Sequence, residues 1–134
     1  MSDDGKGHIG DRVFAPRVVD KPWGHERIFA HTDRYAGKVL HINACQQLSR
    51  QYHQVKEETI YVLSGRLILE VGTCPDVEVT EILPGRAFHV TVGMIHRFSA
   101  PADCDCVLLE VSTPELDDVV RIEDVYGREG TSAP

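Results

Sequence analysis

Apolar residues recur along the chain in short runs, often alternating with polar residues, and Gly, Pro and Asp residues separate the runs. Alternation with a period of two is typical of β-strands, and no stretch keeps a helical period of about 3.6 for even three turns. The pattern predicts strands at residues 26–30, 38–43, 49–53, 59–63, 66–71, 77–82, 87–91, 96–100 and 106–112. Many short strands at regular spacing indicate an all-β barrel or double sheet.

The length of 134 residues suits one compact domain. Residues 1–15 and 129–134 lack an apolar pattern, so we expect flexible ends there and a domain over residues 16–128. Residues 117–128 fit either a short helix or an irregular strand. No apolar run is long enough to span a bilayer, and the polar, acidic start does not resemble a signal peptide. We therefore expect a cytoplasmic protein with no membrane partner.

The charge balance bears on the partners of the protein. Lys and Arg total 14 against 21 Asp and Glu, a formal net charge of -7, and no basic cluster of the kind that follows a phosphate backbone is present. We expect no nucleic-acid partner. A small anionic substrate is compatible with this charge, because a few basic side chains in one pocket can hold a phosphate. So small a β domain has strand edges that need covering, which predicts a homodimer.

Strand geometry can bring several polar side chains to one point. Gln51 and His53 are two apart in a predicted strand, so their side chains point to the same side. Glu58 follows after a four-residue bend, at the start of the strand that would return beside the first. An amide oxygen, an imidazole and a carboxylate can meet in this way, and His96 follows a turn at Gly93.

The spacing of these residues resembles the two sequence motifs of the cupin superfamily, with QxHx4Ex6G starting at Gln51 and Gx5TxGx2H ending at His96. This resemblance implies a single-domain cupin, a double-stranded β-helix or jelly-roll barrel. It also implies a divalent metal held by His53, Glu58 and His96, with Gln51 in the place of the first motif's first His. Zn, Mn, Fe, Ni or Co would fit such a ligand set.

Several flanking segments resemble the type II phosphomannose isomerases, in which the isomerase is the C-terminal cupin domain of a bifunctional mannose-1-phosphate guanylyltransferase. The segments are KPWGHERIF at 21–29, the QxH start, VGMIHR at 92–97 and VVRIEDVYGR at 119–128. The resemblance covers roughly residues 20–128 and implies a metal-dependent aldose–ketose isomerase acting on a sugar phosphate. Those enzymes tend to have a run of His at the first motif, where this chain has Gln54 and Val55 after His53.

An isomerase of this kind needs a group that moves a proton and a cation that holds the phosphate. His41, His89 and Lys38 are the candidate proton carriers, and Lys38 and Arg97 are the candidate phosphate ligands. Strand parity is not fixed by the sequence, so His41 and His89 face either the barrel interior or the solvent. The neighbouring acidic residues 117–118 and Glu57 are expected to be solvated.

Two other functions stay open on the sequence alone. The same barrel with His and carboxylate ligands would suit an Fe(II) dioxygenase, because it leaves coordination sites for O2 and substrate. Alternatively, the chain is a non-catalytic sugar or effector binder that keeps the metal only to hold the barrel together. The missing imidazoles at positions 54 and 55 keep this second alternative open.

Overall fold

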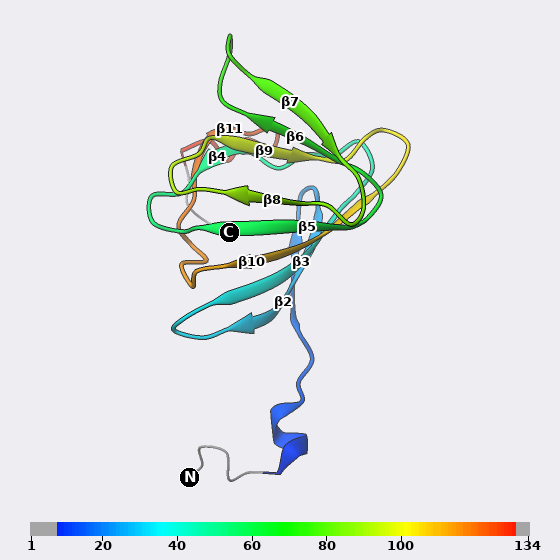
Figure 1. Cartoon of the computed structure of the whole chain (residues 1–134), viewed down its shortest axis with the longest axis vertical. Coiled ribbons are helices and arrows are strands. Elements are labelled where there is room, and N and C mark those ends of the chain that lie inside the picture. Colours follow the sequence, from blue (N-terminus) through cyan, green and yellow to red (C-terminus); the bar gives the residue numbers. More distant parts are fainter. Residues whose placement is uncertain (1–7, 131–134) are drawn as a thin grey trace.

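The computed structural model describes residues 8–130, in which nearly all regular structure is β (Figure 1). A single 3-10 turn, η1, spans Ile9–Arg12 in the described residues. The strands are β1 Arg17–Lys21, β2 Gly24–His31, β3 Ala36–Ile42, β4 Arg50–Tyr52, β5 Glu58–Ser64, β6 Leu67–Val71, β7 Glu78–Ile82, β8 Ala87–Val90, β9 His96–Ser99, β10 Cys106–Ser112 and β11 Val120–Glu123.

Within residues 8–130 the strands form two antiparallel sheets that face each other. Sheet A has the order β1-β2-β3-β10-β5-β8, and sheet B has the order β11-β4-β9-β6-β7. From β3 onward the chain passes back and forth between the sheets, except at the hairpin of β6 and β7 in sheet B. As a result β10 lies between β3 and β5, far from both in sequence. This alternation is the double-stranded β-helix that the motif resemblance implies.

The predicted strands agree closely with the structure, because all nine runs lie on β2 to β10. β1 was not predicted, since it carries only Val18 and Val19 as apolar residues and buries neither. The ambiguous segment 117–128 contains β11 followed by a turn, and no helix. Strands run from Arg17 to Glu123, inside the predicted range 16–128.

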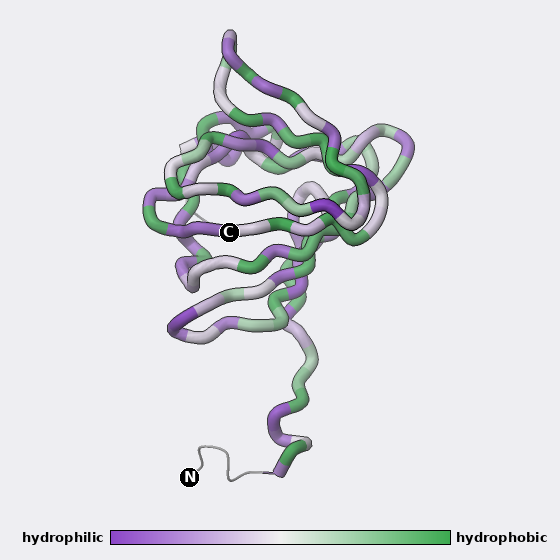
Figure 2. The backbone as a smooth tube through the Cα atoms, viewed as in Figure 1, coloured by the Kyte–Doolittle hydropathy of each residue, from purple (hydrophilic) through white to green (hydrophobic). Residues whose placement is uncertain are grey.

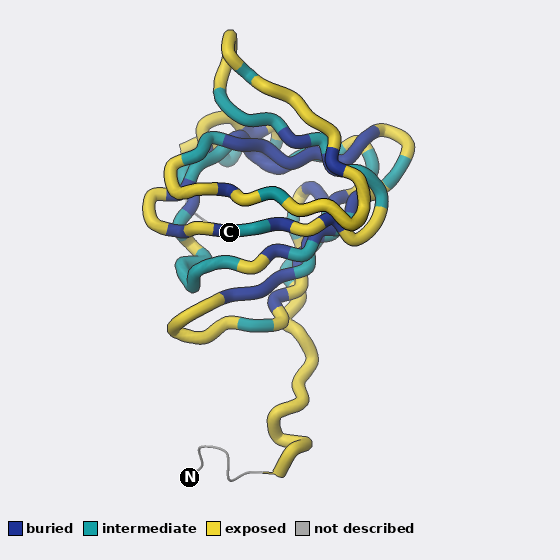
Figure 3. The backbone as a smooth tube through the Cα atoms, in the orientation of Figure 1, coloured by how far each residue is buried: buried dark blue, intermediate teal, exposed yellow. Residues whose placement is uncertain are grey.

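The two chain ends are only partly described. Residues 8–16 lie outside the barrel and are exposed throughout (Figure 3). The predicted flexible ends extend to residues 1–7 and 131–134, which are outside the described residues. No helix among residues 8–130 is long and apolar enough to cross a membrane.

The core follows from the alternation along each strand, visible as changing hydropathy along the tube in Figure 2. In β5 the side chains of Ile60 and Val62 point inward and are fully buried, whereas Tyr61 and Leu63 between and after them are exposed. Burying one such aliphatic side chain contributes about 1.5–3 kcal/mol. Both sheets contribute to this core, which includes Leu40, Ile42, Ile60, Val62, Leu67, Leu69, Val90, Phe98 and Leu108.

Two motif glycines hold the turns that position the site. Gly65, between β5 and β6, has φ 75°, and a Cβ there would lie 1.9 Å from the carbonyl oxygen of Asp105, so only glycine fits. Gly93 has φ 82°, and its N–H donates to the carbonyl of His53 at 2.9 Å. That hydrogen bond joins the turn before β9 directly to the end of β4.

Candidate metal centre and its pocket

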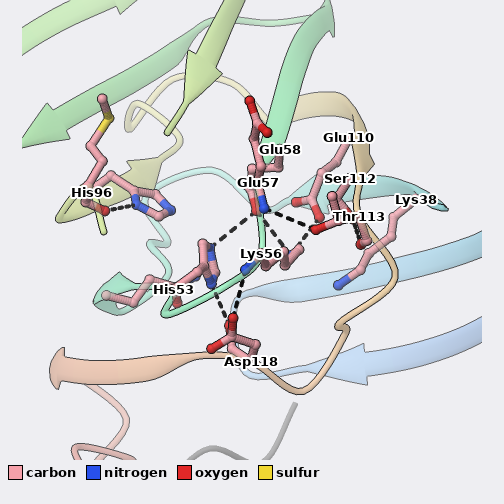
Figure 4. Close-up of polar contacts among 12 residues, drawn as sticks. Lys38, His53, Lys56, Glu57, Glu58, His96, Glu110, Ser112, Thr113 and Asp118 are labelled. Atoms are coloured by element: carbon pink, nitrogen blue, oxygen red, sulfur yellow. Dashed lines mark hydrogen bonds and ion pairs between the residues drawn. The ribbon is translucent and has the colours of Figure 1, made fainter. Parts of the chain in front are cut away.

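Three of the predicted metal ligands meet inside the barrel (Figure 4). His53 directly follows β4, Glu58 begins β5 and His96 begins β9, and one ligand atom from each lies within 4.8 Å of the other two. Their exposed fractions are 2%, 3% and 1%. Strand pairing produces this arrangement, because Gln51 of β4 is the cross-strand partner of His96.

The orientation of the two imidazoles suits metal ligation. His53 Nδ1 lies 2.6 Å from the carbonyl oxygen of Asp118, and His96 Nδ1 lies 2.9 Å from that of Met94. A carbonyl only accepts hydrogen bonds, so each Nδ1 donates, and in the neutral ring Nε2 then presents a lone pair. Such a partner on the other ring nitrogen is typical of metal-binding histidines.

The ligand atoms face one another. His96 Nε2 is buried without a hydrogen-bond partner. His53 Nε2 and Glu58 Oε1 lie 3.2 Å apart, and Lys56 Nζ lies 3.0 Å from the same carboxylate oxygen. Because Nδ1 donates in both rings, two imidazole lone pairs and a carboxylate converge on one point, which is unfavourable unless a cation lies between them. The residues present therefore fit a divalent ion, with His53, Glu58 and His96 as its ligands.

The electrostatic surroundings of Glu58 and His96 favour the protonation states that a metal requires. Burial alone would raise the pKa of the Glu58 carboxyl, but His53 and the Lys56 ammonium outweigh it and the net shift is downward. Burial lowers the pKa of His96, which favours the neutral ring. Lys56 Nζ lies 3.0 Å from Glu58 Oε1 and 3.1 Å from Glu110 Oε2, so the ammonium is buried between two carboxylates.

Asp118 holds the bend between His53 and Glu58. Its carboxylate accepts the backbone N–H groups of Gln54, Val55 and Lys56 at 3.0, 2.7 and 2.8 Å. The expectation that Asp118 is simply solvated is therefore wrong, because it joins the segment before β11 to the metal-site bend through both its side chain and its carbonyl.

His53 and Glu58 border a pocket that both sheets line. Its cavity volume is about 60 Å³, below the roughly 300–1,000 Å³ typical of small-molecule sites. Charged side chains dominate the lining, and they are Lys21, Lys38, Lys56, Arg121 and Arg128 together with Glu26, Glu58 and Glu110. Such a lining suits a polar, charged ligand better than an apolar one.

Two other predicted site residues lie in this pocket. Gln51 lines it, and its amide oxygen accepts a hydrogen bond from the Ser49 hydroxyl at 2.6 Å. Its role as a metal ligand stays a prediction. Lys38 points inward from β3, with Nζ 3.4 Å from Glu26 Oε2.

The structure does not bring His41, His89 or Arg97 into the pocket, which corrects the expectation that they could act there. His41 follows inward-facing Leu40, so strand parity turns it outward, where Nε2 lies 2.8 Å from Asp105 Oδ2. His89 alternates in the same way with buried Val90 and pairs with surface residue Glu57.

Arg97 is likewise on the other face of its strand. It follows His96 directly in β9, so its guanidinium points away from the metal ligands and donates to the carbonyl of Glu123 at 3.2 Å. Arg97 is nevertheless buried, with an exposed fraction of 8%. Its position supports a structural role between β9 and β11.

Sequence reasoning missed six charged residues of the lining, namely Lys21, Glu26, Lys56, Glu110, Arg121 and Arg128. For Glu26 and Glu110 the sequence did contain a signal. Glu26 is two residues from buried Ile28, and Glu110 is two residues from buried Leu108, so each occupies an inward position of a strand. A charge at an inward strand position is costly to bury and therefore marks a polar cavity.

Residues 11–124 match the protein family described as mannose-6-phosphate isomerase C-terminal. The chain belongs to this family. The relatives it matches include the xanthan biosynthesis protein XanB of Xanthomonas campestris, 30% identical over 115 residues, or 84% of this chain and 24% of that protein. The mannose-1-phosphate guanylyltransferase ManC of Salmonella typhimurium is also 30% identical over 115 residues, or 84% of this chain and 23% of that protein. The chain thus spans about a quarter of the length of these relatives.

Solved structures confirm the cupin fold. The capsular polysaccharide assembling protein CapF of Staphylococcus aureus superposes with a TM-score of 0.74 at 18% identity, over 85% of this chain and 33% of that one. A cupin-superfamily sugar phosphate isomerase of Silicibacter pomeroyi superposes with a TM-score of 0.61 at 16% identity, over 77% of this chain and 72% of that one. At these identities the similarity shows the fold alone, whereas the family match relates the chain to proteins of mannose phosphate metabolism.

Proposed function

We propose that this chain is a divalent-metal-dependent isomerase that interconverts an aldose and a ketose sugar phosphate, with mannose 6-phosphate as the first substrate to test. The observation that carries the proposal is the convergence of one ligand atom each from the buried residues His53, Glu58 and His96. Membership of the mannose-6-phosphate isomerase C-terminal family supports the choice of reaction, and the charged pocket supports the choice of a phosphorylated substrate.

The metal would be held by His53, Glu58 and His96, with Gln51 as the proposed fourth ligand. A divalent ion bound there would polarise the carbonyl group of an open-chain sugar and so make the neighbouring C–H group more acidic. The donor set accepts Zn, Mn, Fe, Ni or Co. We propose that the Nδ1 hydrogen bonds of the two histidines keep both rings oriented for ligation throughout the reaction.

Lys38 is the proposed proton carrier. Of the candidate carriers His41, His89 and Lys38, it is the residue that lines the pocket. Glu26 Oε2 lies 3.4 Å from Lys38 Nζ, so the pair places a donor and an acceptor side by side at the pocket wall. We propose that this pair exchanges a proton with the substrate carbons next to the carbonyl group.

The test combines metal content with an isomerisation assay. The purified protein and its His53→Ala, His96→Ala and His89→Ala variants are analysed for bound metal and for formation of fructose 6-phosphate from mannose 6-phosphate. We expect near-stoichiometric metal and turnover in the parent protein and in His89→Ala, the control for removing an imidazole outside the pocket. Both properties should be lost in the other two variants.

The alternatives give different results in the same assay. Oxygen uptake with bound iron and no isomerisation would identify a dioxygenase, and affinity for the sugar without turnover would identify a non-catalytic binder. Absence of metal from the parent protein after reloading would contradict the proposal. The homodimer and the cytoplasmic location stay predictions.

A further inference from the structure

The outer face of sheet A is apolar over its central strands. In β3, β5 and β10 the side chains that alternate with the buried core point outward, and no Asp, Glu, Lys or Arg is among them. An antiparallel sheet with one solvated face commonly alternates apolar inward residues with polar outward ones. The three strands instead have the composition of a sheet that is covered on both faces.

These outward side chains form one continuous patch. Strand pairing places Leu109 of β10 between Val39 of β3 and Tyr61 of β5. The Phe29 ring of β2 lies over Gly37 of β3, where a Cβ would be 2.6 Å from the ring. We call this patch the apolar face and define it as Phe29, Val39, Tyr61, Leu63, Val107, Leu109 and Val111.

The outer face of sheet B differs in charge. Arg50, Glu70 and Arg97 point outward there, because they alternate with buried core residues or metal ligands on β4, β6 and β9. Arg50 forms ion pairs with Glu70 and with Glu123, which lies in β11. Such a face is satisfied by its own ion pairs and by water. The apolar face has no such pairs, and an apolar patch of this kind marks an interaction surface.

The distribution of charge favours a second copy of this chain as the partner. With a net charge of -7, two copies would repel one another if they met through acidic surfaces. On the strands that flank the apolar face, the outward charged residues are Asp20 of β1 and Arg27 of β2, one of each sign. Two copies can therefore meet through this face without placing a surplus of like charges together.

A second apolar element extends from the same sheet. Residues 8–16, which we call the arm, precede the edge strand β1 and run away from the barrel (Figures 1 and 3). Ile9, Val13 and Phe14 of the arm are 86%, 76% and 66% exposed, and η1 within it buries no residue. Three large apolar side chains exposed within nine residues favour association with another surface.

The size of a stable interface requires both elements. With strands about 4.8 Å apart and alternate residues about 6.8 Å apart, the apolar face covers about 300–400 Å². A stable dimer buries about 800 Å² per partner. An extended arm of nine residues is up to about 30 Å long and would cover a strip of about 300 Å². Because each copy gives one arm and receives another, the face and the arms together reach the required size.

We infer that the apolar face is the interface of a two-fold homodimer and that the arm of each copy packs on its partner. In a two-fold dimer the same patch of both copies is in contact. This inference is independent of the proposed function, because the interface lies on the outside of sheet A. The inward side chains Lys38, Glu58 and Glu110 of the same strands line the pocket, so the dimer would hold these strands from behind.

The test measures the mass of the full chain by analytical ultracentrifugation over a wide range of concentrations. Tyr61→Lys and Leu63→Lys each place a charge on the apolar face. Val79→Lys is the matched control, since Val79 is an exposed apolar residue on the outer face of sheet B. A combined Val13→Ser and Phe14→Ser variant tests the arm. Circular dichroism and urea unfolding check that each variant is folded.

We expect a dimeric parent protein. Tyr61→Lys and Leu63→Lys should each raise the dissociation constant about hundredfold or more, because a two-fold interface contains each substitution twice. The arm variant should raise it about tenfold or more, and Val79→Lys should match the parent protein. A monomeric parent protein, or a dimer that both face variants leave unchanged, would overturn the inference. Equal dissociation of Val79→Lys would overturn the assignment to sheet A.

A second measurement needs no substitution. Hydrogen exchange of the parent protein is compared at concentrations well above and well below its dissociation constant. Peptides from the arm should exchange more slowly in the dimer, whereas peptides from β7 at the edge of sheet B should exchange at the same rate in both states. An arm that exchanges equally fast in monomer and dimer would overturn its part in the interface.

Discussion

Replacing Asp118 by Ala should destabilise the fold and weaken the metal site together. The Lys56 N–H is buried, with the residue 4% exposed, and would lose its acceptor at a cost of about 1–3 kcal/mol. The N–H groups of Gln54 and Val55 belong to exposed residues and would turn to water, at about 0.5 kcal/mol each. The expected loss in the free energy of unfolding is therefore about 2–4 kcal/mol.

Metal affinity should fall at the same time. The Ala variant keeps the backbone carbonyl that accepts the Nδ1 hydrogen bond of His53, but it loses the three side-chain contacts that hold this carbonyl beside the metal-site bend. Removing the partner of a ligating histidine typically costs 10–100-fold in metal affinity, so displacing it should cost up to about tenfold. Urea unfolding of the metal-free chain measures the first effect, and titration with Co²⁺ or Zn²⁺ the second. Asp117→Ala is the control, since Asp117 is its exposed neighbour.

The reasoning is refuted if Asp118→Ala and Asp117→Ala have the same urea midpoint and the same metal affinity. Asp118→Asn provides an intermediate case if the Ala variant does not fold. Its amide keeps one oxygen acceptor but turns an N–H₂ group toward a backbone donor, so its stability should lie between those of the parent protein and the Ala variant.

Three further predictions concern pH, a motif glycine and association. Burial lowers the pKa of His96, so below about pH 6.5 the unfolded chain binds a proton that the folded chain resists. The unfolding free energy of the metal-free protein should therefore fall between pH 7 and 5, by up to about 1.4 kcal/mol per pH unit for one proton. His96→Gln should show a shallower pH dependence. Gly65→Ala should lower the unfolding free energy by more than about 2 kcal/mol, because the new Cβ would lie 1.9 Å from a backbone oxygen. Gly85→Ala has a similar φ but open space around the new Cβ, so it should cost less. Equal losses in chemical unfolding would contradict the steric explanation. Val111→Lys, which puts a charge on the exposed outer face of sheet A, should shift the native mass from dimer to monomer, and a monomeric parent protein would make the homodimer prediction wrong.

Strand alternation explains why the fold could be predicted so fully. Strands such as β5 and β10 alternate buried and exposed side chains over their length, and their sequences show it. β1 and β11 are edge strands that bury little, so packing left almost no periodic signal in them. β1 and β11 are thus where sequence-based prediction stopped, although they carry the pocket residues Lys21 and Arg121.

The candidate site was predictable only where residue spacing fixed it. His53, Glu58 and His96 follow turns of defined length, and the structure brings them together. His41 and His89 depended on strand parity, which a single sequence does not determine, and both turned outward. Asp118 acts through a contact 62 to 65 residues away along the chain, which no local pattern contains.

The two parts of the pocket differ in how firmly the fold holds them. The metal ligands come from β4, β5 and β9, which have strand partners within the barrel, and Asp118 and Gly93 fix the loops between them. The basic pocket residues Lys21, Arg121 and Arg128 come from β1 and from β11 with its following turn, at the edges of the two sheets. Edge elements open more readily than central ones, because they have fewer hydrogen bonds and contacts to lose. The side of the pocket formed by β1 and β11 should therefore open more readily than the side that holds the metal ligands.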